Sequence, residues 1–74
     1  MNNDFRFEIV KHFGTLSTSA IGWSVELNLV NWNGKEPKYD LRSWDADHER
    51  MSRGITLTED ELKKLITILD GMEV

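Results

Sequence analysis

Apolar and polar residues alternate along the first part of the chain. From Phe5 to Ile9, apolar and charged residues follow one another with a period of two, which is typical of a half-buried strand and incompatible with a helix. This alternation predicts a first strand over residues 4–13. Gly14 and the small polar run at residues 15–20 then interrupt the pattern.

The alternation resumes at Trp23 and continues at a spacing of two to Leu29, which predicts a second strand. Val30 and Trp32 depart from this phase. Either a bulge near Leu29 shifts the register, or both faces of the sheet are partly covered there. We therefore expect Trp32 to face outward.

A turn signal follows the second strand. The dipeptide Asn33-Gly34 tolerates a positive φ at both positions and indicates a β-hairpin. Pro37 marks the point where pairing resumes, and residues 38–44 form the predicted third strand. The period of two places Tyr39 and Leu41 on one face. The outer face, cationic and aromatic in character, then carries Lys38, Asp40, Arg42 and Trp44.

The period changes after a polar loop at residues 45–52 and a short fourth strand at residues 54–57. Thr58-Glu59-Asp60-Glu61 fits a capping box, so we expect a helix to start at about Glu59. Gly71 is placed to end it. The predicted order is four strands followed by one C-terminal helix. The apolar helix positions recur at i, i+3, i+4 and i+7, and are Leu62, Leu65, Ile66 and Leu69.

The length of the chain limits its architecture. Its 74 residues and 8.6 kDa predict one domain, residues 1–74, whose core supplies only about 3–5 kcal/mol. The chain has no cysteine for a disulfide or a thiolate metal site, and the isolated His12 and His48 argue against a zinc-dependent fold. We therefore expect a homodimer, with an interface formed by Leu62, Leu65, Ile66 and Leu69.

The formal net charge of -4 is unevenly distributed. Residues 58–74 contain two basic and five acidic groups, whereas residues 32–57 contain five of each. The central segment is therefore the part of the chain most compatible with a phosphate backbone. No apolar run approaches the ~18 residues of a membrane span, and the N-terminus lacks signal-peptide features, so we expect a cytoplasmic protein.

Candidate catalytic and metal-binding patterns are weak. The serines lie in no nucleophile-elbow motif, and neither histidine has the sequence context of a triad. Asp45, Asp47 and Glu49 alternate and could hold a hard cation, but the glycine and glutamate of an EF-hand loop are absent, which favours a solvated loop. The glycines are isolated and form no phosphate-binding loop. These patterns predict no enzyme activity, no metal, no cofactor and no small-molecule substrate.

Aromatic and basic residues interleave in the sheet half of the chain. Flat rings stack on unpaired bases while neighbouring cations follow the phosphates, so this interleaving suits single-stranded nucleic acid. The alternative is that the tryptophans are half-buried sheet or dimer-interface residues and the cations keep the surface soluble. An outward Trp44 favours a ligand or a partner. The residues concerned are Trp32, Lys35, Lys38, Arg42, Trp44 and Arg53.

Two segments carry a resemblance to a known family. Residues 40–44, Asp-Leu-Arg-Ser-Trp, precede an acidic loop and then residues 53–58, Arg-Gly-Ile-Thr-Leu-Thr, which lead into the helix. This order resembles the DNA-binding domain of the transcriptional coactivator family of positive cofactor four (p15), and residues 22–23, 30–33 and 36–40 are similar to its bacterial YdbC-like branch. The likeness covers about residues 5–70. It implies a curved antiparallel sheet followed by a helix, with dimerisation through the helices and channels for single-stranded DNA.

The resemblance also implies a binding site. Ser52 departs from the family pattern, which often has a second basic residue there, and the second strand is less basic than expected. The implied function is binding of single-stranded DNA with little sequence specificity, as a homodimer, in transcription or another process that exposes unpaired strands. We expect RNA to be tolerated to some degree. The alternative is a dimeric protein-interaction module that uses Trp32 and Trp44. The implied DNA-binding residues are Trp32, Asn33, Lys35, Lys38, Arg42, Trp44, Arg53 and Gly54.

Overall fold

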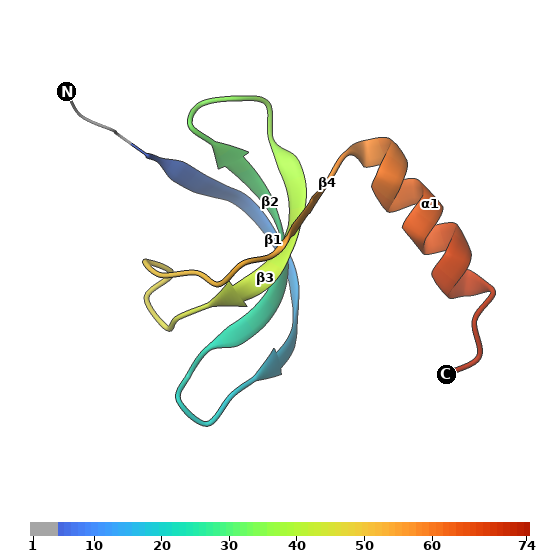
Figure 1. The fold of residues 1–74 in the computed structure, drawn as a ribbon, viewed down its shortest axis with the longest axis horizontal. Helices are drawn as coiled ribbons and strands as arrows, with labels where there is room; N and C mark the ends of the chain where they lie inside the picture. The colour runs from blue at the N-terminus through green and yellow to red at the C-terminus, as the bar shows by residue number, and fades with distance from the viewer. Residues whose placement is uncertain (1–4) are drawn as a thin grey trace.

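The computed structural model describes residues 5–74, which form one open antiparallel sheet and one helix (Figure 1). The strands lie in the sheet in the order in which they occur in the chain. The predicted α+β fold, four antiparallel strands followed by a C-terminal helix, is confirmed. The elements are β1 (Phe7–Thr18), β2 (Ser24–Trp32), β3 (Lys38–Trp44), β4 (Ile55–Leu57) and α1 (Glu59–Asp70).

Strand β1 is longer than the sequence pattern predicts. It continues past residue 13 to Thr18, through Gly14 and into the small polar run. Three irregularities in its pairing with β2 each add a residue to β1 that has no partner opposite. The repeat along β1 therefore becomes three instead of two, which hides the strand from an alternation pattern. The additional residues are Val10, Phe13 and Leu16.

The pairing of β2 with β3 is regular. Each residue from Ser24 to Val30 lies opposite one residue of β3, without a shift. The irregularities thus lie in β1 and not, as one alternative had it, near Leu29 in β2. Val30 and Trp32 leave the phase of Leu29 because they belong to the other face of the sheet, which has apolar residues of its own. Both are covered there, Val30 fully and Trp32 in part.

The sheet has two chemically different faces. Residues that pair directly across neighbouring strands share a face, so the register assigns the sides. One side, which we name the aromatic face, carries Phe7, Ile9, His12, Glu26, Asn28, Val30, Trp32, Lys38, Asp40, Arg42, Trp44 and Thr56. The other side, which we name the aliphatic face, carries Val25, Leu27, Leu29, Tyr39, Leu41, Ile55 and Leu57.

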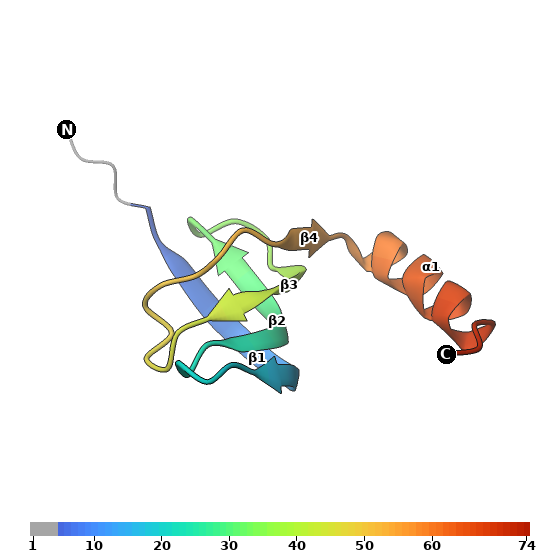
Figure 2. The same cartoon turned by 60° about the horizontal axis from the view of Figure 1, so that its bottom comes forward.

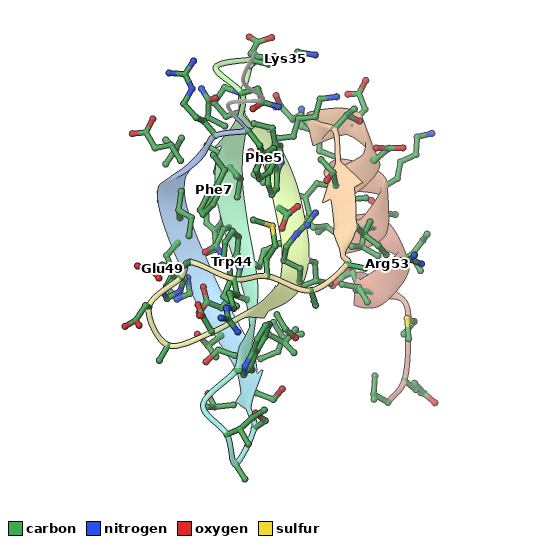
Figure 3. All side chains as sticks on the ribbon, turned by 60° about the vertical axis from the view of Figure 1, so that its left-hand side comes forward. Phe5, Phe7, Lys35, Trp44, Glu49 and Arg53 are labelled. Atoms are coloured by element: carbon green, nitrogen blue, oxygen red, sulfur yellow. The ribbon has the colours of Figure 1, made fainter. Side chains whose placement is uncertain are left out.

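The buried residues all lie on the aromatic face. Among residues 5–74, Val30 and Trp44 are the buried hydrophobic residues. The segment after β3 crosses this face near Trp44 (Figure 3), and an isolated bridge joins Trp44 to Met51. No residue of the aliphatic face is fully buried. The buried polar residues are Glu26, Asn28 and Asp40.

The turn between β2 and β3 has the backbone that the sequence predicts. Asn33 and Gly34 adopt φ values of 55° and 76°. The backbone N–H of Lys35 donates to the carbonyl oxygen of Trp32 at 3.0 Å, which closes the turn. The third strand covers residues 38–44, as expected.

Both predicted ends of the helix are confirmed. The helix begins at Glu59, and the backbone N–H of Glu61 donates to Thr58 Oγ1 at 3.2 Å while the backbone N–H of Thr58 donates to Glu61 Oε1 at 2.8 Å. At the other end, the N–H of Gly71 donates to the carbonyl oxygen of Ile68 at 3.1 Å.

The helix stands away from the sheet. Figures 1 and 2 show it projecting beyond β4 from two directions, and no helix residue is buried. Leu62 and Leu65 are half-buried, whereas Ile66 and Leu69 are 55% and 52% exposed. No helix within residues 5–74 has the length and apolar character needed to cross a membrane.

Candidate nucleic-acid interface

A continuous row of aromatic rings runs along the aromatic face. Phe5 stacks on Trp32 with ring centroids 6.1 Å apart and an interplanar angle of 29°. Phe7 lies 6.1 Å from Trp32 and 5.1 Å from Trp44, and Trp44 lies 5.8 Å from the ring of His48. Figure 3 shows Phe5, Phe7 and Trp44 in this row. The row joins the start of β1 to the ends of β2 and β3.

The accessible end of the row is formed by Phe5 and Trp32. Phe5 is 59% exposed and Trp32 is half-buried. The guanidinium carbon of Arg42 lies 4.7 Å from the ring centroid of Trp32, a cation–π contact that fixes the indole plane. The indole Nε1 of Trp32 is enclosed and has no hydrogen-bond partner among residues 5–74, so the ring offers its face and not its N–H.

Sequence reasoning missed the contribution of Phe5 and Phe7 to this site. Both residues were recognised as apolar positions of the first strand. The available signal was their spacing of two, which places two phenylalanines on one face of a strand. Their proximity to Trp32 could not be inferred, because it depends on the register between β1 and β2.

The expectation that Trp44 is exposed is wrong. The alternation in β3 was interpreted correctly, since Trp44 shares a face with Arg42, but Trp44 is 0% exposed. The loop at residues 45–52 crosses over it, and Phe7 packs against its ring. A strand pattern predicts the face of a side chain, whereas exposure depends on what a loop places above that face. Trp44 is a packing residue in this chain.

Arg42 is also held within the fold, contrary to its expected role as an outward phosphate contact. Its Nε and Nη2 donate to the two carboxylate oxygens of Asp40 at 2.6 and 2.7 Å, and its Nη1 donates to Met51 Sδ and to the carbonyl oxygen of Ser52. The side chain is 13% exposed. This bidentate geometry compensates the positive charge inside the protein.

Asp40 is the partner that holds this arrangement. Its carboxylate is fully buried and accepts a third hydrogen bond, from Thr56 Oγ1 at 3.2 Å. A buried carboxylate is stable only when it is paired and hydrogen-bonded, and both conditions are met. Asp40 therefore orients Arg42, and Arg42 in turn lies against Trp32.

The other basic residues of the predicted site are exposed. Lys35 lies in the β2–β3 turn, Lys38 begins β3, and Arg53 precedes β4. Figure 3 shows Lys35 and Arg53 at separate places around the sheet. None of these three side chains takes part in an ion pair among residues 5–74.

Two further predicted site residues have structural roles. Asn33 Oδ1 accepts the backbone N–H of Arg6 at 2.7 Å, and the N–H of Asn33 donates to the carbonyl oxygen of Arg6, which fastens the start of β1 to the turn. Gly54 lies directly against β3. A Cβ at this position would overlap the Cβ of Arg42 and the carbonyl oxygen of Leu41.

A second polar network fastens the 45–52 loop to the sheet. His48 Nε2 lies 2.9 Å from the buried carboxylate of Glu26, and Asn28 Nδ2 donates to the same carboxylate at 3.1 Å. His12 Nδ1 lies 2.7 Å from Asn28 Oδ1. The network spans β1, β2 and the loop. It keeps the loop in place over Trp44.

Asp45, the first acidic residue of this loop, stabilises the backbone of the loop. Asp45 Oδ1 accepts the backbone N–H groups of Glu49 at 2.8 Å and Arg50 at 3.1 Å. The N–H of Arg50, with that of Glu49, holds the pKa of Asp45 below its ordinary value. Within residues 5–74, no group of three histidine, cysteine, aspartate or glutamate side chains has the arrangement of a metal site.

Comparison with known proteins agrees with this architecture. The family model for Transcriptional Coactivator p15 (PC4) matches residues 19–68. A protein of Treponema pallidum (strain Nichols), described as "Uncharacterized protein", is 45% identical over 74 residues, which is 100% of this chain and 87% of that protein. The domain of the matched family is known for single-stranded DNA binding and a transcriptional coactivator role, and it is non-enzymatic. The chain belongs to the Transcriptional Coactivator p15 (PC4) family.

Proposed function

We propose that this protein binds single-stranded DNA with little sequence specificity, as a homodimer. The observation that carries the proposal is the platform of Phe5 and Trp32, an accessible pair of stacked rings supported from within by Arg42. Every base has a flat face, so stacking on such a platform tolerates any sequence and contributes about 1–3 kcal/mol per base. A duplex keeps its bases stacked on one another and offers no such face.

The exposed cations supply the backbone contacts in this proposal. Lys35, Lys38 and Arg53 follow the phosphates, together with the accessible backbone near Asn33 and Gly54. The charge of the whole chain is -4, so the chain as a whole repels DNA at long range, and stacking contributes the larger share of the binding free energy. The acidic first turn of α1 lies beyond β4 (Figure 1).

A second copy of the chain completes the fold in this proposal. The helix has no buried residue, and the apolar residues of the aliphatic face are half-buried or exposed. One chain therefore presents two apolar surfaces that it cannot cover by itself, and isologous pairing buries both. The helix residues of the interface are Leu62, Leu65, Ile66 and Leu69.

The cellular role follows from the ligand. A homodimer that holds unpaired strands without regard to sequence acts in transcription, or in another process that exposes single strands, and works in the cytoplasm. RNA is tolerated to some degree, because neither stacking nor a lysine requires the absence of a 2′-hydroxyl.

Competition between matched oligonucleotides tests the proposal. The tryptophan fluorescence of the protein is titrated with a thymine dodecamer, with a mixed-sequence single strand and with the duplex of that strand, at several salt concentrations. We expect both single strands to bind more tightly than the duplex, with a negative slope of log affinity against log salt. Equal or tighter binding of the duplex would defeat the proposal.

The alternative function is a dimeric protein-interaction module that docks a partner through Trp32 and Trp44. The burial of Trp44 removes one of its two anchors. The salt titration separates the two functions, because an apolar protein interface depends much less on salt than phosphate contacts do.

A further inference from the structure

An open recess lies beside the aromatic platform. It has a volume of about 340 Å³ and is lined by Phe5, Trp32, Arg42, Met51 and Thr56. We propose that one base of the bound strand enters this recess and places a ring carbonyl oxygen against the guanidinium of Arg42. The inference rests on the proposed binding of single strands and specifies what one subsite of that surface recognises.

The walls of the recess suit a flat ring. Phe5 and Trp32 form one side, and their stacked rings offer a π surface. The Met51 side chain lines the recess as well and supplies a polarizable thioether, which packs well against aromatic systems. A base that enters is therefore in contact with apolar groups over its ring faces.

Arg42, which lines the recess and which we call its floor, provides a hydrogen-bond donor. Arg42 has five N–H groups, and four of them are used: one on Nε and one on Nη2 by Asp40, and the two on Nη1 by Met51 Sδ and the carbonyl oxygen of Ser52. The second N–H of Nη2 has no partner among residues 5–74. In the planar guanidinium it points away from the carboxylate that binds the first. A carbonyl oxygen is the acceptor that this N–H lacks.

The charge of the floor favours a base over a phosphate. The carboxylate of Asp40 is fully buried against the guanidinium, so the Arg42–Asp40 pair carries no net charge. A phosphate at this place would lie near both members of a neutral pair. A neutral carbonyl oxygen gains the hydrogen bond without meeting an uncompensated negative charge.

A shape-matched base without acceptors tests the proposal in the wild-type protein. Affinities are measured by fluorescence anisotropy for a fluorescein-labelled thymine dodecamer and for the same strand with difluorotoluene, which keeps the shape of thymine but lacks its carbonyl oxygens, in place of every base. We expect the thymine strand to bind about fivefold more tightly, the change that one net hydrogen bond produces. Equal affinities within twofold would overturn the subsite and leave single-strand binding intact. No binding of the thymine strand at low salt would instead defeat the proposed function.

A matched pair of variants then assigns the effect to Arg42. Arg42→Lys keeps a cation beside Asp40 but removes Nη2, so the two strands should bind alike within twofold. Arg50→Lys, at an exposed loop position outside the recess, should keep the fivefold preference. Persistence of the full preference in Arg42→Lys would overturn the assignment. If that variant does not fold, the side-chain N–H signals of wild-type Arg42 in ¹⁵N NMR decide, because they should shift with the thymine strand and stay in place with the difluorotoluene strand.

Discussion

The two faces of the sheet differ in which side chains they bury. On the aromatic face the buried residues include two carboxylates and an amide, of Glu26, Asp40 and Asn28. On the aliphatic face none of the apolar side chains is fully buried. Polar side chains, which are usually exposed, are buried on the aromatic face, whereas the apolar side chains of the aliphatic face are partly exposed to solvent.

The difference lies in which groups find partners within one chain. Each buried polar side chain of the aromatic face has an internal partner: Asp40 pairs with Arg42, Glu26 lies against His48, and Asn28 bonds to Glu26. The buried side-chain nitrogens left without a partner among residues 5–74 are the indole Nε1 atoms of Trp32 and Trp44. An apolar surface, in contrast, is removed from water only when another surface packs against it. The helix α1 does not do this, because it projects away from the sheet (Figures 1 and 2). Exposed apolar residues next to or on the aliphatic face and on the helix include Val10, Phe13, Leu16, Ile55, Ile66 and Leu69.

The largest loss of stability should follow from a charge placed in the apolar surface of the helix. Leu65→Asp places a charge in the proposed helix interface, which costs about 3–5 kcal/mol when the charge is buried and unpaired. A single chain buries few apolar residues, so we expect an unfolded chain and not a folded monomer. Circular dichroism and sedimentation measure this.

Thr67→Asp is the matched control, because Thr67 lies on the opposite side of the helix and is exposed. It should leave both the fold and the oligomeric state unchanged. A folded Leu65→Asp monomer would place the interface elsewhere, and would show that one chain is complete on both faces.

The next effect should come from the ion pair of the aromatic face. Asp40→Asn leaves the guanidinium of Arg42 enclosed without its counter-charge, and we expect a loss of about 3 kcal/mol in the free energy of unfolding, measured by urea denaturation. Glu59→Gln breaks the exposed pair with Lys63 on the helix and should cost less than about 1 kcal/mol. Equal losses in both variants would mean that the burial of the Asp40 pair has no energetic consequence.

A smaller loss should follow when the close approach of Gly54 to β3 is blocked. Gly54→Ala forces a Cβ against the backbone of Leu41 and the Cβ of Arg42, so the chain must shift, at about 1–3 kcal/mol. Gly14→Ala meets nothing within 4 Å and should change stability by less than about 1 kcal/mol. Thermal denaturation of the two variants measures the contrast. Similar melting temperatures would refute the close packing.

Local patterns predicted most of the fold. The ends of β3 and the whole helix follow from a turn dipeptide, a period of two and a capping box, which depend on neighbouring residues only. The end of β1 does not, because its three additional residues produce a repeat of three that exists only in pairing with β2. A bulge is defined by the pairing of two strands, so it leaves little trace in the sequence of either strand alone.

The positions of some candidate site residues also follow from local patterns. Trp32 and Lys35 lie where the sequence indicated, next to the turn. The exposure of Trp44 and the availability of Arg42 were misjudged. The loop at residues 45–52, which directly follows Trp44, covers its ring, and the carboxylate of Asp40 binds Arg42. Residues 40 and 42 share a face by alternation, so the ion pair was a contact that the pattern allowed but did not require.

Removal of one exposed ring should weaken DNA binding without unfolding the protein. Phe5→Ala takes away the accessible half of the platform, and we expect a loss of about 1–3 kcal/mol for each base that stacks there, with a melting temperature within a few degrees of wild type. Ile21→Ala removes an exposed apolar side chain from the turn between β1 and β2 and should leave DNA affinity unchanged. Fluorescence titration measures both. An equal loss of affinity in Ile21→Ala would show that the ring of Phe5 has no specific role in DNA binding.

The smallest effect should separate charge from stacking on the aromatic face itself. Lys35 is exposed in the turn, and its turn hydrogen bond uses the backbone, so Lys35→Ala should leave the fold intact. Loss of one phosphate contact reduces the slope of log affinity against log salt by about 0.7, whereas loss of a stacked ring leaves that slope nearly constant. Lys64→Ala, on the exposed surface of the helix, should change neither affinity nor slope. If Lys35→Ala lowers affinity equally at every salt concentration, Lys35 contacts no phosphate.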